Sequence, residues 1–375
     1  GLGIDVFAAL TSGDNNVVAG FSAGNDLTTG SRNTALGTNA LDKATTPNDN
    51  TAIGFAAMTA TTTGGANTAV GKRALQTNTT ASNNTAIGSS AMYANTEGAS
   101  NVAVGASALG ANTTANSNTA VGFNALSANT TGTENSAIGY HAALGMTTGN
   151  YNTSFGSNAL VHNTTSDENT AIGRSAMHQL TTGAKNTSVG YRSGHDMTTG
   201  TSNVCIGAEA GTAMTTTTGN IAIGQDALKV QTTANYNTAV GYRAGIAVTS
   251  AIGVVLMGYD AGKGITTGDT NICIGGFSMD GGAGKTAYGC THIGHAGQRT
   301  GTSGNFNDSM GIDAFKNPTT GNSNVCLGSG SGNVITTGSS NSLVGRTAGV
   351  AITTGSLNSC VGIVAGSAIT TGAKN

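Results

Sequence analysis

A glycine recurs every 17 residues along almost the whole 375-residue chain, and this period constrains the fold more than any other feature. The step holds from Gly3 to Gly275, lengthens once to 19 residues before Gly294, and then resumes as far as Gly362. A fixed period of this length is typical of a repeat architecture in which each unit stacks on its neighbours. We therefore treat residues 1–375 as a single repetitive domain, with an irregular 19-residue repeat and a bulge at 276–305.

The residues around each glycine predict a short β-strand. Counting from the glycine as position 0, position −4 is nearly always Asn, −3 is mostly Thr, −2 is mostly Ala and −1 is a large aliphatic residue. The β-branched residues at −3 and −1 alternate as they do in a strand, and the flanking Asn and Gly suit turns. We predict an all-β fold, a β-solenoid or β-roll of about 22 coils, each with two short strands and a loop.

Two other positions compensate for each other in size, which indicates a shared interior. Where position +4 is large, position +7 is usually polar, as in Leu75 with Asn78, whereas a glycine at +4 accompanies a large +7, as in Gly211 with Met214. In a close-packed interior, two small residues at these positions would leave a cavity, and two large residues would clash. The predicted core contains, at −1, Ile53, Val70, Ile87, Val104 and Val121; at +4, Leu75, Met92, Leu109 and Leu126; and at +7, Met197, Met214, Ile352 and Ile369.

The columns at −4 and −2 predict a side-chain ladder and a lateral contact. Asparagines stacked in successive coils can pair their amides, and the predicted Asn ladder contains Asn50, Asn67, Asn84, Asn101 and Asn118. Position −2 lies on the strand face opposite −1 yet is small and apolar, and a strand that is apolar on both faces is expected to be buried on both. The residues predicted to pack between chains, preferably in a homotrimer, are Ala52, Ala69, Ala86, Ala103, Ala120, Cys326 and Cys360.

Cysteine and histidine supply the few candidates for chemistry. Four of the five cysteines replace Ala at position −2, which favours small buried apolar residues, with cross-links between chains as the alternative. Cys290 lies in a predicted turn and is the better candidate for a reactive thiol. Together with His292 and His295 it is also a weak candidate for a transition-metal site at a symmetry axis. Residues 281–286 resemble a phosphate-binding loop only superficially, because the first glycine of that motif and the following helix are missing.

Composition excludes several classes of function. Only 9% of residues are charged and only 2 are Pro, which is unlike a disordered chain. The net charge of −2 offers no electrostatic footprint for nucleic acid, and no apolar run is long enough to insert into a membrane. No catalytic set of residues recurs with the repeat. We expect neither enzymatic activity nor a cofactor.

The motif from Asn118 to Gly132, Asn-Thr-Ala-Val-Gly followed by Ala-Leu and Asn-Thr-Thr-Gly, resembles repeats of phage tail fibres and bacterial surface adhesins. It is also similar to the strand motif in the β-roll heads of trimeric autotransporter adhesins, although the present repeat is longer. This resemblance implies a trimeric, extracellular fibre on a cell surface or virion that holds or binds a surface. A host-cell surface or a glycan would then be its receptor.

The sequence leaves two functional readings open. The first is a structural or adhesive extracellular fibre that assembles laterally through copies of itself. The repeat phase at the two ends fits either a segment of a longer fibre or subunits that stack head to tail into a filament. The second reading is an ice- or glycan-binding solenoid module. Paired threonines in the loops raise ice binding, but adjacent Thr side chains point in opposite directions, which weakens that case.

Overall fold

The computed structural model describes residues 2–282, 284–299, 301 and 303–375. Within these residues the regular elements are 21 β-strands of three residues each, and there is no helix. The chain divides into two compact units, residues 1–185 (unit 1) and residues 186–375 (unit 2), which are described separately. In both units the expected all-β solenoid with a 17-residue repeat is confirmed.

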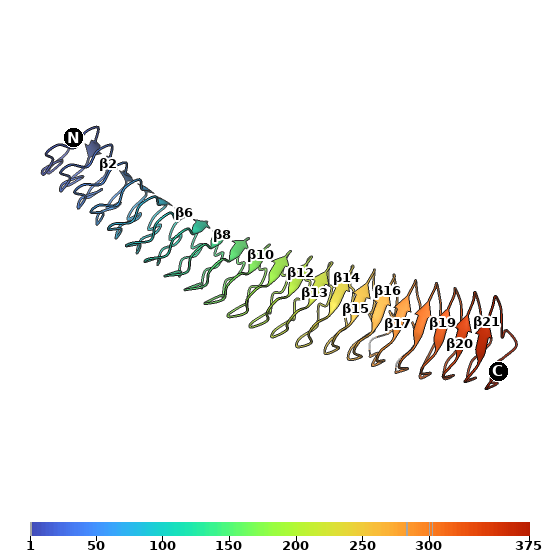
Figure 1. Cartoon of the computed structure of the whole chain (residues 1–375). Helices are drawn as coiled ribbons and strands as arrows, with labels where there is room; N and C mark the ends of the chain where they lie inside the picture. Colours follow the sequence, from blue (N-terminus) through green and yellow to red (C-terminus); the bar gives the residue numbers. More distant parts are fainter. Residues whose placement is uncertain (1, 283, 300, 302) are drawn as a thin grey trace. The chain divides into compact units, whose positions relative to one another are not determined.

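Unit 1 is a stack of coils in which each strand pairs in parallel with the strand of the next coil (Figure 1). The shared register is Thr51↔Thr68, Ala52↔Ala69 and Ile53↔Val70, so equivalent positions lie above one another. Its strands are β1 (Val17–Ala19), β2 (Thr34–Leu36), β3 (Thr51–Ile53), β4 (Thr68–Val70), β5 (Thr85–Ile87), β6 (Val102–Val104), β7 (Thr119–Val121), β8 (Ser136–Ile138), β9 (Thr153–Phe155) and β10 (Thr170–Ile172).

Unit 2 repeats this arrangement. Its strands are β11 (Thr187–Val189), β12 (Val204–Ile206), β13 (Ile221–Ile223), β14 (Thr238–Val240), β15 (Val255–Met257), β16 (Ile272–Ile274), β17 (Thr291–Ile293), β18 (Asp308–Met310), β19 (Val325–Leu327), β20 (Ser342–Val344) and β21 (Ser359–Val361). The 19-residue step falls between β16 and β17, which still pair as Ile272↔Thr291. The two extra residues therefore leave the strand register intact. Residues 283, 300 and 302 of the predicted bulge at 276–305 lie outside the described part.

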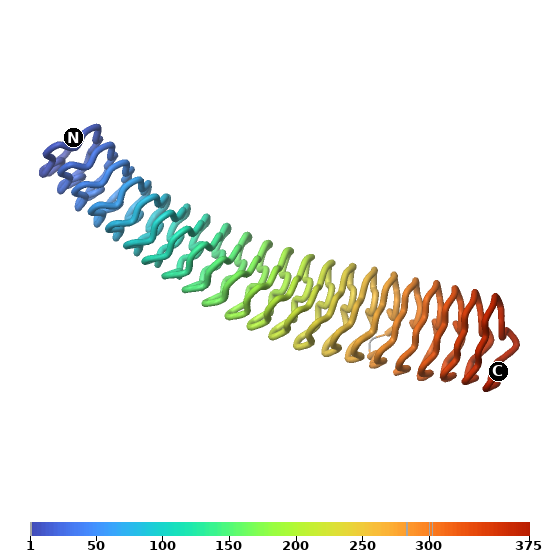
Figure 2. The backbone as a smooth tube through the Cα atoms, viewed as in Figure 1, coloured from blue at the N-terminus to red at the C-terminus, as the bar shows by residue number. Residues whose placement is uncertain are grey.

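Each coil contains one strand, so the prediction of two strands per coil is wrong (Figure 1). Figure 2 follows the backbone through the successive coils of each unit. The second segment cannot be a strand because positions +2 and +4 are left-handed, with φ of 58° at Arg73 and 52° at Leu75. It is nevertheless bonded to both neighbouring coils. The backbone N–H of Arg73 donates to the carbonyl of Phe55 (2.8 Å), and that of Leu75 donates to the carbonyl of Ala91 (2.9 Å).

The glycine at position 0 is required by a close approach between coils. Gly54 has φ of +135°, and a Cβ atom built there would lie 2.5 Å from the carbonyl oxygen of Gly71 in the next coil. Any other residue would therefore clash with backbone that cannot move without disturbing the stack. This contact explains why the glycine marks the repeat so regularly.

The buried Asn column at −4 forms the predicted ladder. Oδ1 of Asn84 accepts the backbone N–H of Asn101 (2.9 Å), and Nδ2 of Asn84 donates to the carbonyl of Gly98 in the following loop (2.9 Å). Asn suits position −4 because its amide is both donor and acceptor, whereas Asp would bring an unpaired charge into the interior. The same pattern links Asn50, Asn67, Asn84, Asn101 and Asn118.

A second amide ladder, at position +7, was not foreseen. Asn95 Nδ2 donates to Asn78 Oδ1 (3.1 Å), Asn112 Nδ2 to Asn95 Oδ1 (2.7 Å), and Asn129 Nδ2 to Asn112 Oδ1 (3.2 Å). All four side chains are buried. The polar residues that accompany a large +4 therefore lie inside the coil as well, where their amide N–H groups donate to one another and to loop carbonyls, as in Asn95 and Asn112.

Candidate functional site

The two faces of the strand are reversed relative to the prediction. Ala52, Ala69, Ala86, Ala103 and Ala120 are fully buried inside the chain, so they cannot pack against another chain. The aliphatic residues at −1, placed in the core by the sequence analysis, face outward and are partly or largely exposed, as shown by Ile53, Val70, Ile87, Val104 and Val121. The interior is too narrow for a large side chain at −2 as well as at +4, and this is why −2 is Ala.

The interior is filled from positions +4 and +7. The side chains buried there include Leu75, Met92, Leu109, Leu126, Met197, Met214 and Ile352, as the size compensation indicates. Ile369, in the last coil, is partly buried and packs on a cluster that contains Cys360 and Ile352. Position −2 shares the same space. A Cβ atom at Gly349 would lie 2.6 Å from Leu343 and 3.0 Å from Ile352, so glycine at +4 makes room for both.

The cysteines are internal and unreactive. All five are buried and none is in a disulfide. Burial raises the pKa of Cys205, Cys273 and Cys326 to about 12. The predicted inter-chain role of Cys326 and Cys360 is therefore wrong, because both side chains point into their own coil. Cys290 is also buried, and burial raises its pKa, so it is a poor candidate for a reactive thiol.

The suggested metal cluster is not assembled. Cys290 and His292 are buried at −4 and −2, whereas His295 is exposed. His292 Nε2 accepts the backbone N–H of Gly297 (3.1 Å), which leaves Nδ1 to donate to Ser309 Oγ (2.7 Å). Within the described residues, no three His, Cys, Asp or Glu side chains are placed to hold a metal ion.

Lys285, from the segment that resembles a phosphate-binding loop, points into the solenoid. Ala283 of that segment lies outside the described residues. Nζ of Lys285 donates to the carbonyls of Arg299 (2.7 Å) and Gly301 (2.5 Å). Burial lowers its pKa to about 8. These hydrogen bonds hold the irregular coil together, and the ammonium group does not face a site where a phosphate could bind.

Exposed apolar side chains recur on the outer face of the sheet, defined by the side chains at −3 and −1. In unit 1 the −3 column is mostly Thr and the −1 column is mostly Ile or Val, and Ile87 and Ile138 are 40% and 41% exposed. In unit 2, Met257, Met310 and Leu327 occupy the same column and are also exposed. Because the strands share one register, these side chains form continuous rows along each unit.

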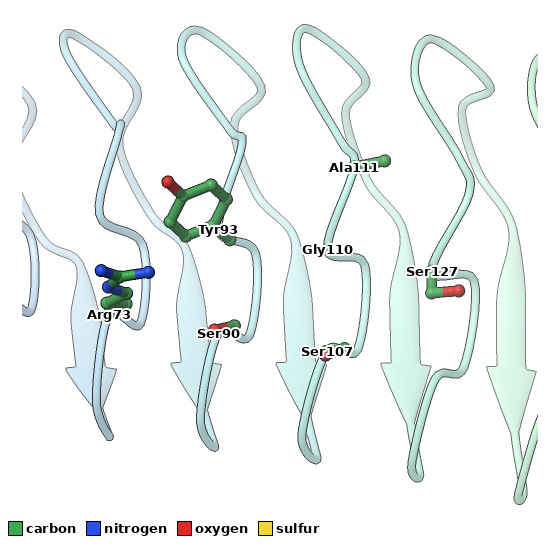
Figure 3. A pocket seen from close by; sticks show the side chains of 7 residues that line it. All are labelled: Arg73, Ser90, Tyr93, Ser107, Gly110, Ala111 and Ser127. Carbon is green, nitrogen blue, oxygen red and sulfur yellow. The ribbon is translucent and has the colours of Figure 1, made fainter.

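A shallow groove of about 500 Å³ lies on a different surface of unit 1 (Figure 3). The Tyr93 ring and Ser127 stand on either side of Gly110 and Ala111, with Arg73, Ser90 and Ser107 along one edge. The sequence analysis did not single out any of these residues. One signal was present, because Gly110 is the only glycine at position +5 in the chain.

In the described part of the chain, no helix is both long and apolar enough to cross a membrane. No protein-family model matches the chain, and no curated protein is significantly similar to it.

Proposed function

We propose that this chain is a structural or adhesive extracellular fibre, of the phage tail-fibre or bacterial surface-filament kind, whose copies associate laterally through the outer sheet face. The exposed rows of aliphatic side chains at position −1 carry the proposal. Extended apolar patches on soluble proteins mark interaction surfaces, whereas single exposed aliphatic residues do not. The interior supports a scaffold role, since each coil is bonded to both neighbours by backbone and amide ladders.

A second copy of the chain is the partner that fits this face best. Its rows repeat at the spacing of paired strands, about 4.8 Å, and only a partner with the same spacing keeps every side chain in register. Each unit presents a flat area on the order of 500 Å². One unit alone therefore supplies more than half of the roughly 800 Å² that one side of a standard interface buries. The proposed assembly is a homotrimer in which these faces meet.

Sedimentation of the full chain tests this proposal. The wild type is expected to sediment as an oligomer, and Ile87→Lys with Ile138→Lys is expected to shift it to monomer, because charges would be buried in the interface. Thr80→Lys with Thr131→Lys places the same charges on exposed loop positions of the same unit and should leave the oligomer intact. A monomeric wild type, or equal effects of the two pairs, would contradict the proposal.

Ice binding is a second candidate, and one observation favours it. The objection to paired loop threonines does not apply to the threonines at position −3, which form a regular column on the flat outer face. Thermal hysteresis of the purified chain separates the two functions. Hysteresis in a monomeric wild type, lost in Thr68→Tyr with Thr119→Tyr, would favour ice binding over lateral assembly.

A further inference from the structure

We infer that the groove around Gly110 binds a carboxylated oligosaccharide through Arg73, Tyr93 and the serine hydroxyls. The inference goes beyond the proposed fibre and does not depend on lateral assembly, because none of these residues lies at −3 or −1. The groove exists because Gly110 occupies position +5, where the preceding coil has Tyr93 and the following coil has Ser127 (Figure 3). Its volume of about 500 Å³ is within the usual range of small-molecule sites.

The edge of the groove is held rigidly by backbone bonds. Arg73, Ser90 and Ser107 all lie at position +2 with left-handed φ of 58°, 57° and 54°. The N–H of Ser90 donates to the carbonyl of Lys72 (2.9 Å), and that of Ser107 to the carbonyl of Ser89 (3.0 Å). The backbone at Tyr93 is held too, because Thr77 Oγ1 donates to its carbonyl (2.8 Å). A ligand would therefore meet a backbone that is already ordered, and binding would order only the side chains of the groove.

The lining groups select an anionic ligand that also carries hydroxyls. Arg73 supplies the one charge, and a guanidinium binds a carboxylate through two parallel hydrogen bonds. Three serine hydroxyls can each donate and accept, which matches sugar hydroxyls. The Tyr93 ring, 37% exposed, offers a flat apolar surface with a polar end. No carboxylate lines the groove, so nothing there repels an acidic sugar.

The shape of the groove favours a chain of sugars over a single one. Its lining residues come from four successive coils, those of Arg73, Ser90, Ser107 and Ser127. Four coils at about 4.8 Å each extend along the stacking direction for a length that one monosaccharide cannot span. The open side of the groove leaves both ends of such a chain free to continue over the surface.

In unit 2, several cations of the same two columns are held in ion pairs, and Arg73 differs from them. Lys229 bonds Asp226 (2.9 Å) and Glu209, and Lys263 bonds Asp260 (3.3 Å). In the described part of the chain, Arg73 has no carboxylate within ion-pair distance. Lys229 and Lys263 are thus already paired with acids, whereas the Arg73 guanidinium lies beside an open groove.

Binding of oligogalacturonate to the full chain tests the inference by titration calorimetry. The wild type is expected to bind it, and Arg73→Gln is expected to weaken binding roughly 10- to 100-fold through loss of a charge-assisted bond. Gly110→Gln should weaken binding similarly by filling the groove. Lys72→Gln removes an equal charge from the neighbouring exposed position and should change the affinity less than about twofold. Circular dichroism of each variant checks the fold.

The probes also distinguish the recognised group. A neutral oligoglucan should not bind, and a sulfated oligosaccharide should bind more weakly than the carboxylated one, because a sulfate ester spreads its charge over three oxygens and each is a weaker hydrogen-bond acceptor. Equal losses for Arg73→Gln and Lys72→Gln would show non-specific attraction and overturn the inference. Absence of oligogalacturonate binding to the wild type would overturn it as well. Either result would leave the proposed lateral assembly unaffected, because sedimentation tests that assembly independently.

Discussion

Units 1 and 2 have the same coil but fill it in different ways. In unit 1 most coils place Leu or Met at +4, in left-handed conformation, beside a small −2 and a polar +7. In unit 2 glycine usually takes +4, and larger residues enter from −2 and +7, as with Leu343 and Ile352 around Gly349. The left-handed backbone at +4 suits glycine better than Leu. The side chains that fill the interior thus have a similar total volume in both units, but they come from different positions of the repeat.

The units also differ in the continuity of their polar ladder. In unit 1 the Asn column at −4 runs unbroken from Asn33 to Asn169. In unit 2 it is interrupted at Val254 and Cys290, which accept no bond from the next coil through a side-chain oxygen. Near the second interruption the interior contains Lys285 and His292. The repeat is most regular where the asparagine amides at −4 stack without a break, as in unit 1. Buried polar residues at unusual positions lie near an interruption of this column in unit 2.

Removing one amide from the continuous ladder should have the largest effect. Asn50→Ala leaves the N–H of Asn67 and the carbonyl of Gly64 without partners. Each buried unpaired group costs about 1–3 kcal/mol, so the free energy of unfolding should fall by about 2–6 kcal/mol. The converse change, Val254→Asn, should raise it by about 1 kcal/mol by filling the gap in unit 2. Urea unfolding followed by circular dichroism measures both, and equal effects would remove the distinction between the units.

Acid should destabilise unit 2 through His292. Burial lowers the pKa of this imidazole to about 4, whereas an unfolded histidine has its ordinary value near 6.5. Below pH 6.5 the unfolded state therefore binds more protons, and stability is lost as the pH falls towards 4. The expected loss is on the order of 3 kcal/mol. Urea unfolding at pH 7 and pH 4 should show it in the wild type and much less in His292→Ala, and an equal loss in both would contradict the assignment.

Adding a side chain at +4 in unit 2 should show that this slot is already occupied. A Cβ atom at Gly211 would lie 2.7 Å from Cys205 Sγ and 2.9 Å from Met214 Sδ. Gly211→Leu is expected to cost about 1–3 kcal/mol through overpacking. Combining it with Cys205→Ala and Met214→Asn gives the unit 1 pattern and should restore most of the loss in thermal unfolding. If the triple variant is no more stable than the single one, the two fillings are not equivalent.

Joining two interrupted pieces of the +7 ladder should give a small gain. Asn129 Oδ1 and Asn163 Nδ2 are both buried without a partner, and the coil between them carries Ala143 and Met146. Ala143→Leu with Met146→Asn would supply an amide to both while keeping the interior volume. The melting temperature should rise, corresponding to about 1 kcal/mol. Met146→Asn alone should lower it, because the bulky side chain is then missing.

The sequence alone predicted the coil, its period, the −4 ladder and the compensation between +4 and +7. It failed on the direction of the strand, because Thr-Ala-Ile alternates equally well whichever face is inside. A usable signal was that a large aliphatic residue at −2, as at Leu256 and Leu343, occurs beside a glycine at +4. The glycine at +5 was the one sequence signal for the groove, because Arg73, Tyr93 and Ser127 are separated in sequence and are brought to one surface only by the stacking of coils.

The hydrogen bonding that repeats between neighbouring coils affects how the length of the gene can change. Because one coil offers its successor the same donors and acceptors that it receives, a gene segment encoding a whole repeat could be duplicated or lost without breaking any pairing. The molecule's reach can thus be lengthened or shortened in steps of one coil, while changes at the outward positions alter what it touches.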